Sequence, residues 1–238
     1  MSDKIVEPVT QLPGIGALSL TDEIRAFTQQ ARERLPADYI GKFVALIDKL
    51  ITDEVGKRAP AVGDAFPDFI LEDEQAKQVR AGEHWGGKNL IVKFYRGGWC
   101  PYCNLELNAL ERHAPELAVA NAELLAIAPE KITYRQETKK KTGASFKFLW
   151  DEKCALAKQL GIAFEIGDAV RDIYLELDID LLTVNGEWVL PIPATFVVRD
   201  GIVRYRFIDA DYMKRQDPVD LLGVLRELND MLPTGAVA

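Results

Sequence analysis

The chain has 238 residues, of which 48% are apolar and 28% are charged, as is ordinary for a folded protein with one large domain or with a domain and an extension. Its formal net charge of −8, with no basic stripe, argues against nucleic-acid binding. The N-terminus lacks the apolar core of a secretory signal and no apolar run approaches the roughly 18 residues that cross a bilayer, so we expect a cytoplasmic protein that does not enter a membrane.

Residues 1–58 are expected to form an extension that precedes a main domain at 59–238. Prolines and glycines indicate an irregular arm over residues 1–18, and apolar residues at helical spacing then predict two helices, over 21–35 and 40–55. The apolar positions include Ile24, Phe27, Phe43 and Ile47. Because apolar stripes of this size are seldom left in water, they must pack either on the main domain or on a second subunit in a homodimer.

Strands and helices alternate through the main domain. The predicted strands lie at 70–72, 78–80, 89–95, 123–128, 146–149, 195–199 and 203–208, and the predicted helices begin at Cys100, with a break at Pro115, and cover 132–142, 154–160 and 218–231. The run at 89–95 is almost entirely apolar, as in a strand covered on both faces. Asp200-Gly201 is a strong turn pair for a closing hairpin. This order predicts an α/β domain built on a mixed sheet.

Two of the three cysteines, Cys100 and Cys103, stand one helical turn apart directly after the most apolar predicted strand. Pro101 suits the first position of a helix, which places Cys100 at the N-cap. The free amides and the dipole of a helix N-terminus favour an anion, so we expect the pKa of Cys100 to be lowered and its thiolate to act as a nucleophile. Cys103 lies on the same helix face and is placed to attack a mixed disulfide formed at Cys100.

The residues around the pair fit this interpretation. Gly97 and Gly98 allow a tight turn without a side chain over the sulfur, and Trp99 supplies an apolar shoulder that restricts water. Two alternatives stay open: half of a zinc site with His113, for which a second cysteine pair is missing, and a pair of inert buried thiols. Cys154 is either a third redox cysteine or a structural thiol, and its position at the start of a helix favours the second.

The motif "WCPYC" at a strand-to-helix corner resembles the thioredoxin superfamily, and the wider pattern resembles the peroxiredoxin-like branch of the alkyl hydroperoxide reductase/thiol-specific antioxidant family. The matching pieces, which span roughly residues 61–228, are "VGDAFPDFILEDEQAKQV", "FYRGGWCPYCNLELNAL", "LLAIAPE", "PIPATFVVRDGIVRYRF" and "DADYMKRQDP". The resemblance implies a thioredoxin-like mixed sheet with flanking helices, to which the N-terminal helices are an addition.

The resemblance also implies roles for particular residues. Cys100 matches the attacking cysteine and Cys103 the second cysteine, and the two would form a redox-active disulfide. Pro193 matches the proline that is cis in these folds and faces the cysteines, and the backbone of Ile192 before it would pair with bound substrate. The residues expected to bind substrate are therefore Trp99, Ile192, Pro193 and Arg96.

The chain departs from the family pattern at the groups that bind the peroxide oxygens. A threonine or serine usually stands three residues before the attacking cysteine, where this chain has Gly97, and a second arginine usually stands where this chain has Pro193. Arg96 either substitutes as a cation beside Cys100 or is a solvated loop residue. Asp209, Asp211 and Tyr212, which follow the last predicted strand, are expected at the edge of the site.

These observations predict a thiol-dependent oxidoreductase that reduces disulfides, hydroperoxides or both. It would need no metal, flavin or nucleotide, and a thiol reductant of the thioredoxin, glutaredoxin or glutathione type would regenerate it. Because donors to the peroxide are missing, we expect slow reduction of hydrogen peroxide and better reduction of disulfides. The alternative is a redox-sensing or binding module in which oxidation of the pair changes a partner surface.

Overall fold

The predicted strands of the main domain assemble into one mixed sheet in the computed structural model, which describes residues 18–231. The sheet has seven strands in the order β2-β1-β5-β4-β3-β8-β9, in which β3, β4 and β5 are parallel neighbours and the other pairs are antiparallel. The strands are β1 (Ile70–Glu72), β2 (Gln78–Arg80), β3 (Asn89–Phe94), β4 (Ala122–Ala128), β5 (Lys147–Trp150), β8 (Ala194–Arg199) and β9 (Ile202–Ile208). The expected α/β mixed sheet is confirmed.

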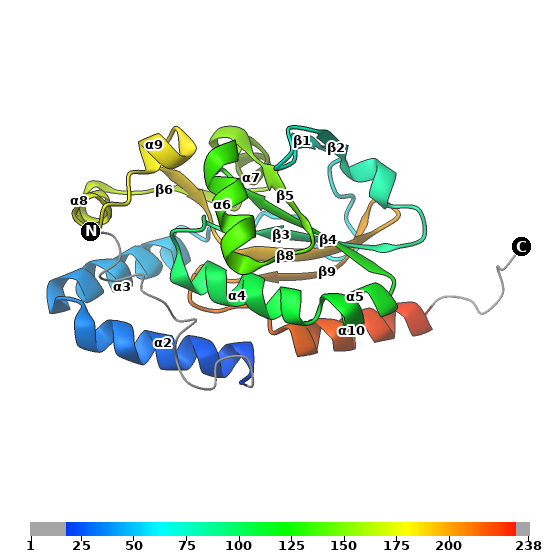
Figure 1. Cartoon of the computed structure of the whole chain (residues 1–238), viewed down its shortest axis with the longest axis horizontal. Coiled ribbons are helices and arrows are strands. Elements are labelled where there is room, and N and C mark those ends of the chain that lie inside the picture. Colours follow the sequence, from blue (N-terminus) through cyan, green and yellow to red (C-terminus); the bar gives the residue numbers. More distant parts are fainter. Residues whose placement is uncertain (1–17, 232–238) are drawn as a thin grey trace, which may run out of the picture.

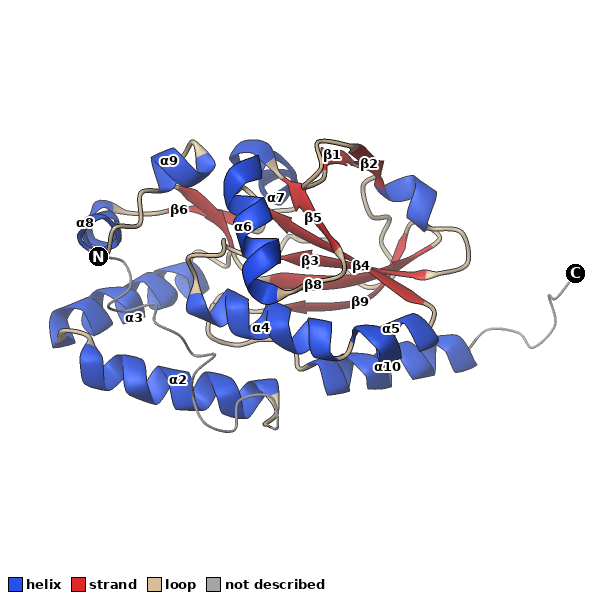
Figure 2. Cartoon of the chain, viewed as in Figure 1, coloured by secondary structure: helices blue, strands red, loops and turns tan. Residues whose placement is uncertain are grey.

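Helices flank this sheet (Figures 1 and 2). They are α2 (Leu20–Arg34), α3 (Ala37–Thr52), α4 (Pro101–Arg112), α5 (Ala114–Val119), α6 (Ile132–Thr142), α7 (Ala155–Gln159), α8 (Asp168–Glu176), α9 (Leu181–Asn185) and α10 (Pro218–Asp230), with short 3-10 turns η2 (Ala81–His84) and η3 (Glu152–Cys154). The break expected at Pro115 separates α4 from α5, and Asp217 caps α10 as its side chain accepts the Val219 N–H. No helix within residues 18–231 is long and apolar enough to cross a membrane.

One part of the main domain was not predicted: residues 163–191 form α8, α9 and a second, two-stranded sheet. Its strands are β6 (Ala163–Glu165) and β7 (Val189–Pro191). Both strands are three residues long, and α9 is five, so none of them leaves a periodic pattern long enough to recognise. The unpredicted helix α8 matters for function because it supplies a tyrosine to the candidate site.

The central strand β3 determines where the site lies. All six of its residues are buried, since it pairs with β4 on one side and with β8 on the other. The chain leaves β3 and begins α4 after a short loop, so the N-terminus of α4 stands at the carboxyl end of β3. The closing hairpin between β8 and β9 turns at Asp200 and Gly201, whose φ angles of +53° and +74° suit the expected turn.

The N-terminal helices pack on the main domain of the same chain. Figure 1 shows α2 and α3 at the end of the sheet where α4 begins. Glu23 of α2 forms an ion pair with Arg112 of α4 at 2.9 Å, and three residues of α3 join the main hydrophobic core: Leu46, Ile47 and Leu50. The first of the two expected arrangements is therefore present, and these apolar faces do not require a homodimer for their burial. The expected irregular arm, at 1–17, lies outside the described residues.

We expect Leu50→Ala to lower the free energy of unfolding by about 2–5 kcal/mol, since truncating a core leucine loses apolar burial and leaves a cavity. Leu50 is 2% exposed and belongs to the same core as the sheet. Urea denaturation followed by circular dichroism measures the change. Val44→Ala is the control on the same helix, because Val44 is 45% exposed and should change stability by no more than about 0.5 kcal/mol. Equal effects of both substitutions would show that α3 does not contribute to the core.

Candidate active site

Cys100 and Cys103 occupy the start of α4, as predicted from the sequence. Cys100 is the N-cap, with extended backbone angles of φ −88° and ψ 113°, and Pro101 is the first helical residue. The carbonyl of Cys100 accepts the N–H groups of Cys103 and Asn104, which closes the first helical turn. Both cysteines are free thiols and both are buried, so the structure represents the reduced form of the pair.

A buried arginine stands against the first sulfur. Nη1 of Arg96 lies 3.9 Å from Sγ of Cys100, and its Nη2 donates to the hydroxyl of Tyr174. The guanidinium also packs over the rings of Tyr212, at 4.2 Å from the centroid, and of Trp99, at 5.0 Å. Arg96 is 2% exposed, so of the two roles considered from the sequence the structure places it as a cation beside Cys100 and not as a solvated loop residue.

A second arginine stands against the other sulfur. Nη2 and Nη1 of Arg215 lie 3.6 and 3.7 Å from Sγ of Cys103, which also accepts the backbone N–H of Arg96 at 3.4 Å. Nη1 of Arg215 donates to Oε2 of Glu106 at 2.6 Å, and Oε1 of Glu106 is 2.5 Å from Nζ of Lys93. The side chains of Lys93, Glu106 and Arg215 are at most 1% exposed.

The two thiols have opposite pKa shifts. Burial would raise the pKa of Cys100, but the hydrogen bond from Cys103 and the charges of Arg96 and Arg215 outweigh it and lower this pKa to about 5. Burial raises the pKa of Cys103 well above its ordinary value, and the hydrogen bond to Cys100 and the negative charge there raise it further. Near neutral pH the pair therefore holds one thiolate, at Cys100, and one proton, at Cys103.

The turn before Cys100 excludes the hydroxyl residue of the family pattern. Gly97 has φ +149°, a conformation that side chains rarely adopt, and a Cβ atom there would lie 2.3 Å from Nε1 of Trp99. The Trp99 indole therefore occupies the space beside position 97. The absence of a hydroxyl side chain at position 97 therefore follows from the conformation of this loop and from the position of the Trp99 indole.

A buried carboxylate holds the same loop. Glu130 accepts the backbone N–H of Gly98 at 2.7 Å and the hydroxyls of Tyr95 at 3.0 Å and of Thr138 at 3.1 Å. Burial raises the pKa of Glu130 to about 6, against the lowering effect of these hydrogen bonds. The loop is thus fixed by a group whose charge changes close to neutral pH.

Four aromatic side chains cover the cysteines: Trp99, Tyr102, Tyr174 and Tyr212, called here the aromatic cover. Trp99 packs on Tyr174 with ring centroids 5.2 Å apart, and Tyr102 packs on Tyr212 at 6.0 Å. The N-terminal helices lie against this layer, since Phe27 of α2 contacts Tyr102 and Phe43 of α3 contacts Tyr174. Cys100 is only 1% exposed, which agrees with the apolar shoulder expected from Trp99 to restrict water.

The structure differs from the expectation at Ile192 and Pro193 in two respects, the peptide bond and the backbone N–H, and their contact with substrate stays a prediction. The peptide bond between them is trans. The N–H of Ile192 donates to the carbonyl of Ile162 at 2.8 Å, so it is already used. The physical reason is the unpredicted small sheet, because Ile192 continues the pairing of β7 with β6 up to the start of β8. Both residues are buried, and a substrate strand has no free N–H to pair with at Ile192.

Cys154 is arranged as a structural thiol. Its Sγ donates to the carbonyl of Val189 at 3.5 Å, and burial raises its pKa. No group of three or more histidine, cysteine, aspartate or glutamate side chains within residues 18–231 is placed to hold a metal ion.

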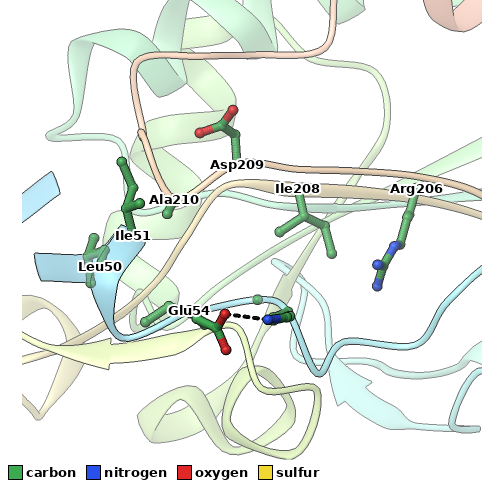
Figure 3. Close-up of a pocket in the computed structure, with 10 residues that line it drawn as sticks. Leu50, Ile51, Glu54, Arg206, Ile208, Asp209 and Ala210 are labelled. Atoms are coloured by element: carbon green, nitrogen blue, oxygen red, sulfur yellow. Dashed lines mark hydrogen bonds and ion pairs between the residues drawn. The ribbon is translucent and has the colours of Figure 1, made fainter. Parts of the chain in front are cut away.

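A cavity of about 430 Å³ opens beside the end of α3 and the end of β9 (Figure 3). Leu50, Ile51, Ile208 and Ala210 give it an apolar wall, and Glu54 pairs with Lys57 at its rim. Neither Cys100 nor Cys103 lines this cavity, so it is not the reaction site.

The residues of the site that the sequence did not reveal include Lys93, Glu106 and Arg215, which surround Cys103. The sequence did hold a signal for two of them. Lys93 interrupts an otherwise apolar buried strand, and Glu106 lies one turn after Cys103 on the same helix, so each predicts a buried charge that requires a partner. Arg215 carried no such signal, because it stands in a polar loop far along the chain.

Comparisons with known proteins agree with this geometry. The sequence model of the AhpC/TSA family matches residues 62–206. The chain is 28% identical to peroxiredoxin Bcp of Escherichia coli K12 over 100 residues, which are 42% of this chain and 64% of the relative. It is 32% identical to the thiol-disulfide oxidoreductase ResA of Geobacillus thermodenitrificans over 71 residues, 30% of this chain and 40% of the relative. The alignments thus span less than two thirds of either relative.

Among solved structures, the fold is similar to that of peroxidoxin BcpB from Mycobacterium tuberculosis, with a TM-score of 0.57 and 18% sequence identity. The match covers 71% of this chain and 98% of that structure. The described helices and the mixed sheet of the main domain are therefore of the peroxiredoxin type within the thioredoxin-like folds, which confirms the fold expected from the motif.

Proposed function

Because the chain belongs to the AhpC/TSA family, we propose that it is a thiol-dependent oxidoreductase in which Cys100 attacks the oxidant and Cys103 resolves the product. The observation that carries this proposal is the division of charge within the pair. Cys100 is a thiolate at a helix N-terminus beside Arg96, and Cys103 keeps its proton one turn away. A pair of inert buried thiols would need neither arginine.

The geometry supports a small hydroperoxide as the first substrate. The thiolate of Cys100 attacks the distal peroxide oxygen, and the S–O bond of a sulfenic acid forms as the O–O bond breaks. The alkoxide or hydroxide that leaves takes up a proton from water. The guanidinium of Arg96, whose Nη1 is 3.9 Å from the attacking sulfur, would supply positive charge for this step. The aromatic cover favours a small molecule over a protein disulfide as the oxidant, since Cys100 is 1% exposed in the reduced form and a protein disulfide could reach it only if the cover opened.

Cys103 then attacks the sulfur of Cys100, and the pair forms a disulfide with release of water. An external dithiol or two equivalents of a monothiol, of the thioredoxin, glutaredoxin or glutathione type, would return the pair to the reduced form. Disulfide reduction is the second candidate function, and the adjacent cysteine pair and the similarity to ResA favour it. A protein that only senses oxidation would not require a buried cation beside its second cysteine.

We expect hydrogen peroxide to react with the reduced protein about 10²–10³-fold more slowly than with a peroxiredoxin that carries threonine at the position of Gly97. The loss of one oriented donor to developing negative charge commonly costs this factor.

Stopped-flow tryptophan fluorescence measures this rate in both proteins. The same measurement with an organic hydroperoxide and then with a protein disulfide tests the proposed function. Reaction with the organic hydroperoxide but not with the protein disulfide supports a peroxidase; the reverse result supports the second candidate. Reaction with none of the three would contradict the proposed function.

A further inference from the structure

A chain of buried charges ends on the second cysteine. It runs from Lys93 of β3 through Glu106 of α4 to Arg215, which lies before α10, and its last member places two N–H groups within 3.7 Å of the sulfur of Cys103. Burying three charged groups carries a large desolvation cost, and even well-paired buried ions add little to stability on average. Such a chain is therefore weakly explained by stability and points to a task at Cys103.

The hydrogen-bond donors around Cys103 do not suit the protonated thiol that this residue carries in the reduced pair. In the reduced pair Cys103 keeps its proton and donates a hydrogen bond to Cys100, yet three N–H groups aim at its sulfur, two from Arg215 and one from the backbone of Arg96. N–H donors and a guanidinium charge stabilise a thiolate and gain little from a thiol. The arrangement suits a later state, in which Cys103 holds the negative charge.

Oxidation of Cys100 produces that state. A sulfenic acid or a mixed disulfide at Cys100 is uncharged, so the thiolate that kept the proton on Cys103 is gone, while both arginines remain. Other charged and titratable groups act on Cys103 or surround it: Lys93, Tyr95, Cys100, Glu106, Glu130 and Tyr174. Of these neighbours only Lys93 adds a further positive charge, and its ammonium forms an ion pair with Oε1 of Glu106.

We propose that Arg215 is a catalytic residue of the resolving step, which stabilises the Cys103 thiolate once Cys100 has been oxidised, and that Glu106 is the positioning residue that holds Arg215 there. The inference rests on the proposed function, because it requires Cys100 to react first. The negative charge of the pair then moves from Cys100 to Cys103 during each cycle, and the two arginines, one beside each sulfur, hold it in both positions.

The step balances without a further reactant. The Cys103 thiol gives up its proton, its sulfur attacks the sulfur of Cys100, and the new S–S bond forms as the bond from Cys100 to its leaving group breaks. From a sulfenic acid the leaving hydroxide takes the proton and becomes water. From a mixed disulfide the leaving thiolate takes it and becomes a thiol. Cys100 sulfur is reduced relative to the sulfenic acid, and Cys103 sulfur is oxidised.

The test separates the two attacks with an aromatic disulfide, 4,4′-dithiodipyridine, mixed with the reduced full-length protein in a stopped-flow spectrometer. Attack by Cys100 releases one equivalent of the coloured pyridine thione, and resolution by Cys103 releases a second. We expect Arg215→Gln to slow the second phase about 10- to 100-fold and the first phase much less, and to move the pH midpoint of the second phase upward. Arg215→Lys, which keeps the charge, should restore part of the rate.

Two further variants separate positioning from structure. Glu106→Gln removes the ion-pair partner but keeps the shape, and should also raise the pH midpoint of the second phase. Arg199→Gln is the matched control, because Arg199 is a buried arginine with three side-chain hydrogen bonds at the opposite end of β8, and should leave both phases unchanged.

An unchanged second phase in Arg215→Gln, or equal slowing of both phases, would overturn the inference. If the Arg215 variants do not fold, the wild-type protein decides: a pH midpoint for the second phase at or above the free-thiol value of about 8.5 contradicts the inference, and a lower one supports it. Absence of the first phase in the wild type would contradict the proposed function, and the inference with it. A normal first phase with an unaltered second phase contradicts the inference alone.

Discussion

Cys100→Ser is expected to reduce turnover with every oxidant to the background rate, whereas Cys103→Ser should still complete one attack and then stop. The thiolate is the nucleophile in this chemistry, and a serine hydroxyl at the same position stays protonated near neutral pH. Cys103 has the opposite pKa shift, so it cannot replace Cys100 as the first nucleophile. Intact-protein mass spectrometry after one equivalent of oxidant distinguishes the two variants: no mass change for Cys100→Ser, and a sulfenic acid or mixed disulfide for Cys103→Ser.

Cys154→Ser is the control for both substitutions. Cys154 is buried away from the pair, and a serine hydroxyl can still donate to the carbonyl of Val189. Turnover should therefore be unchanged. Full activity of Cys100→Ser would show that the assignment of the nucleophile is wrong, and loss of activity in Cys154→Ser would give the third cysteine a redox role.

Arg96→Met is expected to slow the attack of Cys100 on a hydroperoxide by about 10²–10³-fold at pH 7, the cost of removing one oriented charge from a developing anion. Arg96 does two things at once. It helps to lower the pKa of Cys100, and under the proposed function its charge would stabilise the negative charge that develops as the peroxide bond breaks. Methionine has a similar length and keeps an apolar contact with the rings of Trp99 and Tyr212.

The pH dependence of alkylation by iodoacetamide isolates the first of these effects. In the wild type the reactivity of Cys100 should persist down to about pH 5 and be lost as the pH falls through that value, because the thiolate exists only above its pKa. In Arg96→Met the midpoint should rise, since burial still raises the pKa and one opposing charge is gone. Arg96→Lys should lie between the two. An unshifted midpoint in Arg96→Met would leave Arg215 and the hydrogen bond from Cys103 as the groups that activate Cys100.

Much of the fold and the centre of the site were determined by the sequence alone. The order of strands and helices, the helix caps at Cys100 and Asp217, and the Asp200-Gly201 turn follow from local patterns that act over a few residues: periodicity, proline at a first helical position, and turn pairs. The cysteine pair was identifiable for the same reason, because its activation by a helix N-terminus depends on neighbours in the sequence.

Only the tertiary structure decided how that pair is surrounded. Arg215 reaches Cys103 from a loop more than a hundred residues later, and Tyr174 reaches Arg96 from a helix that the sequence did not reveal. The backbone pairing of Ile192 depended on a strand too short to predict, and the burial of Cys100 arises from the packing of the whole domain, in which α2 and α3 contact Tyr102 and Tyr174. These features arise from contacts between residues distant in the chain, and the charge and exposure of a sulfur are sums over such contacts. The sequence therefore predicted Cys100 as the nucleophile, and the packing of the whole domain determined the charge and the exposure of its sulfur.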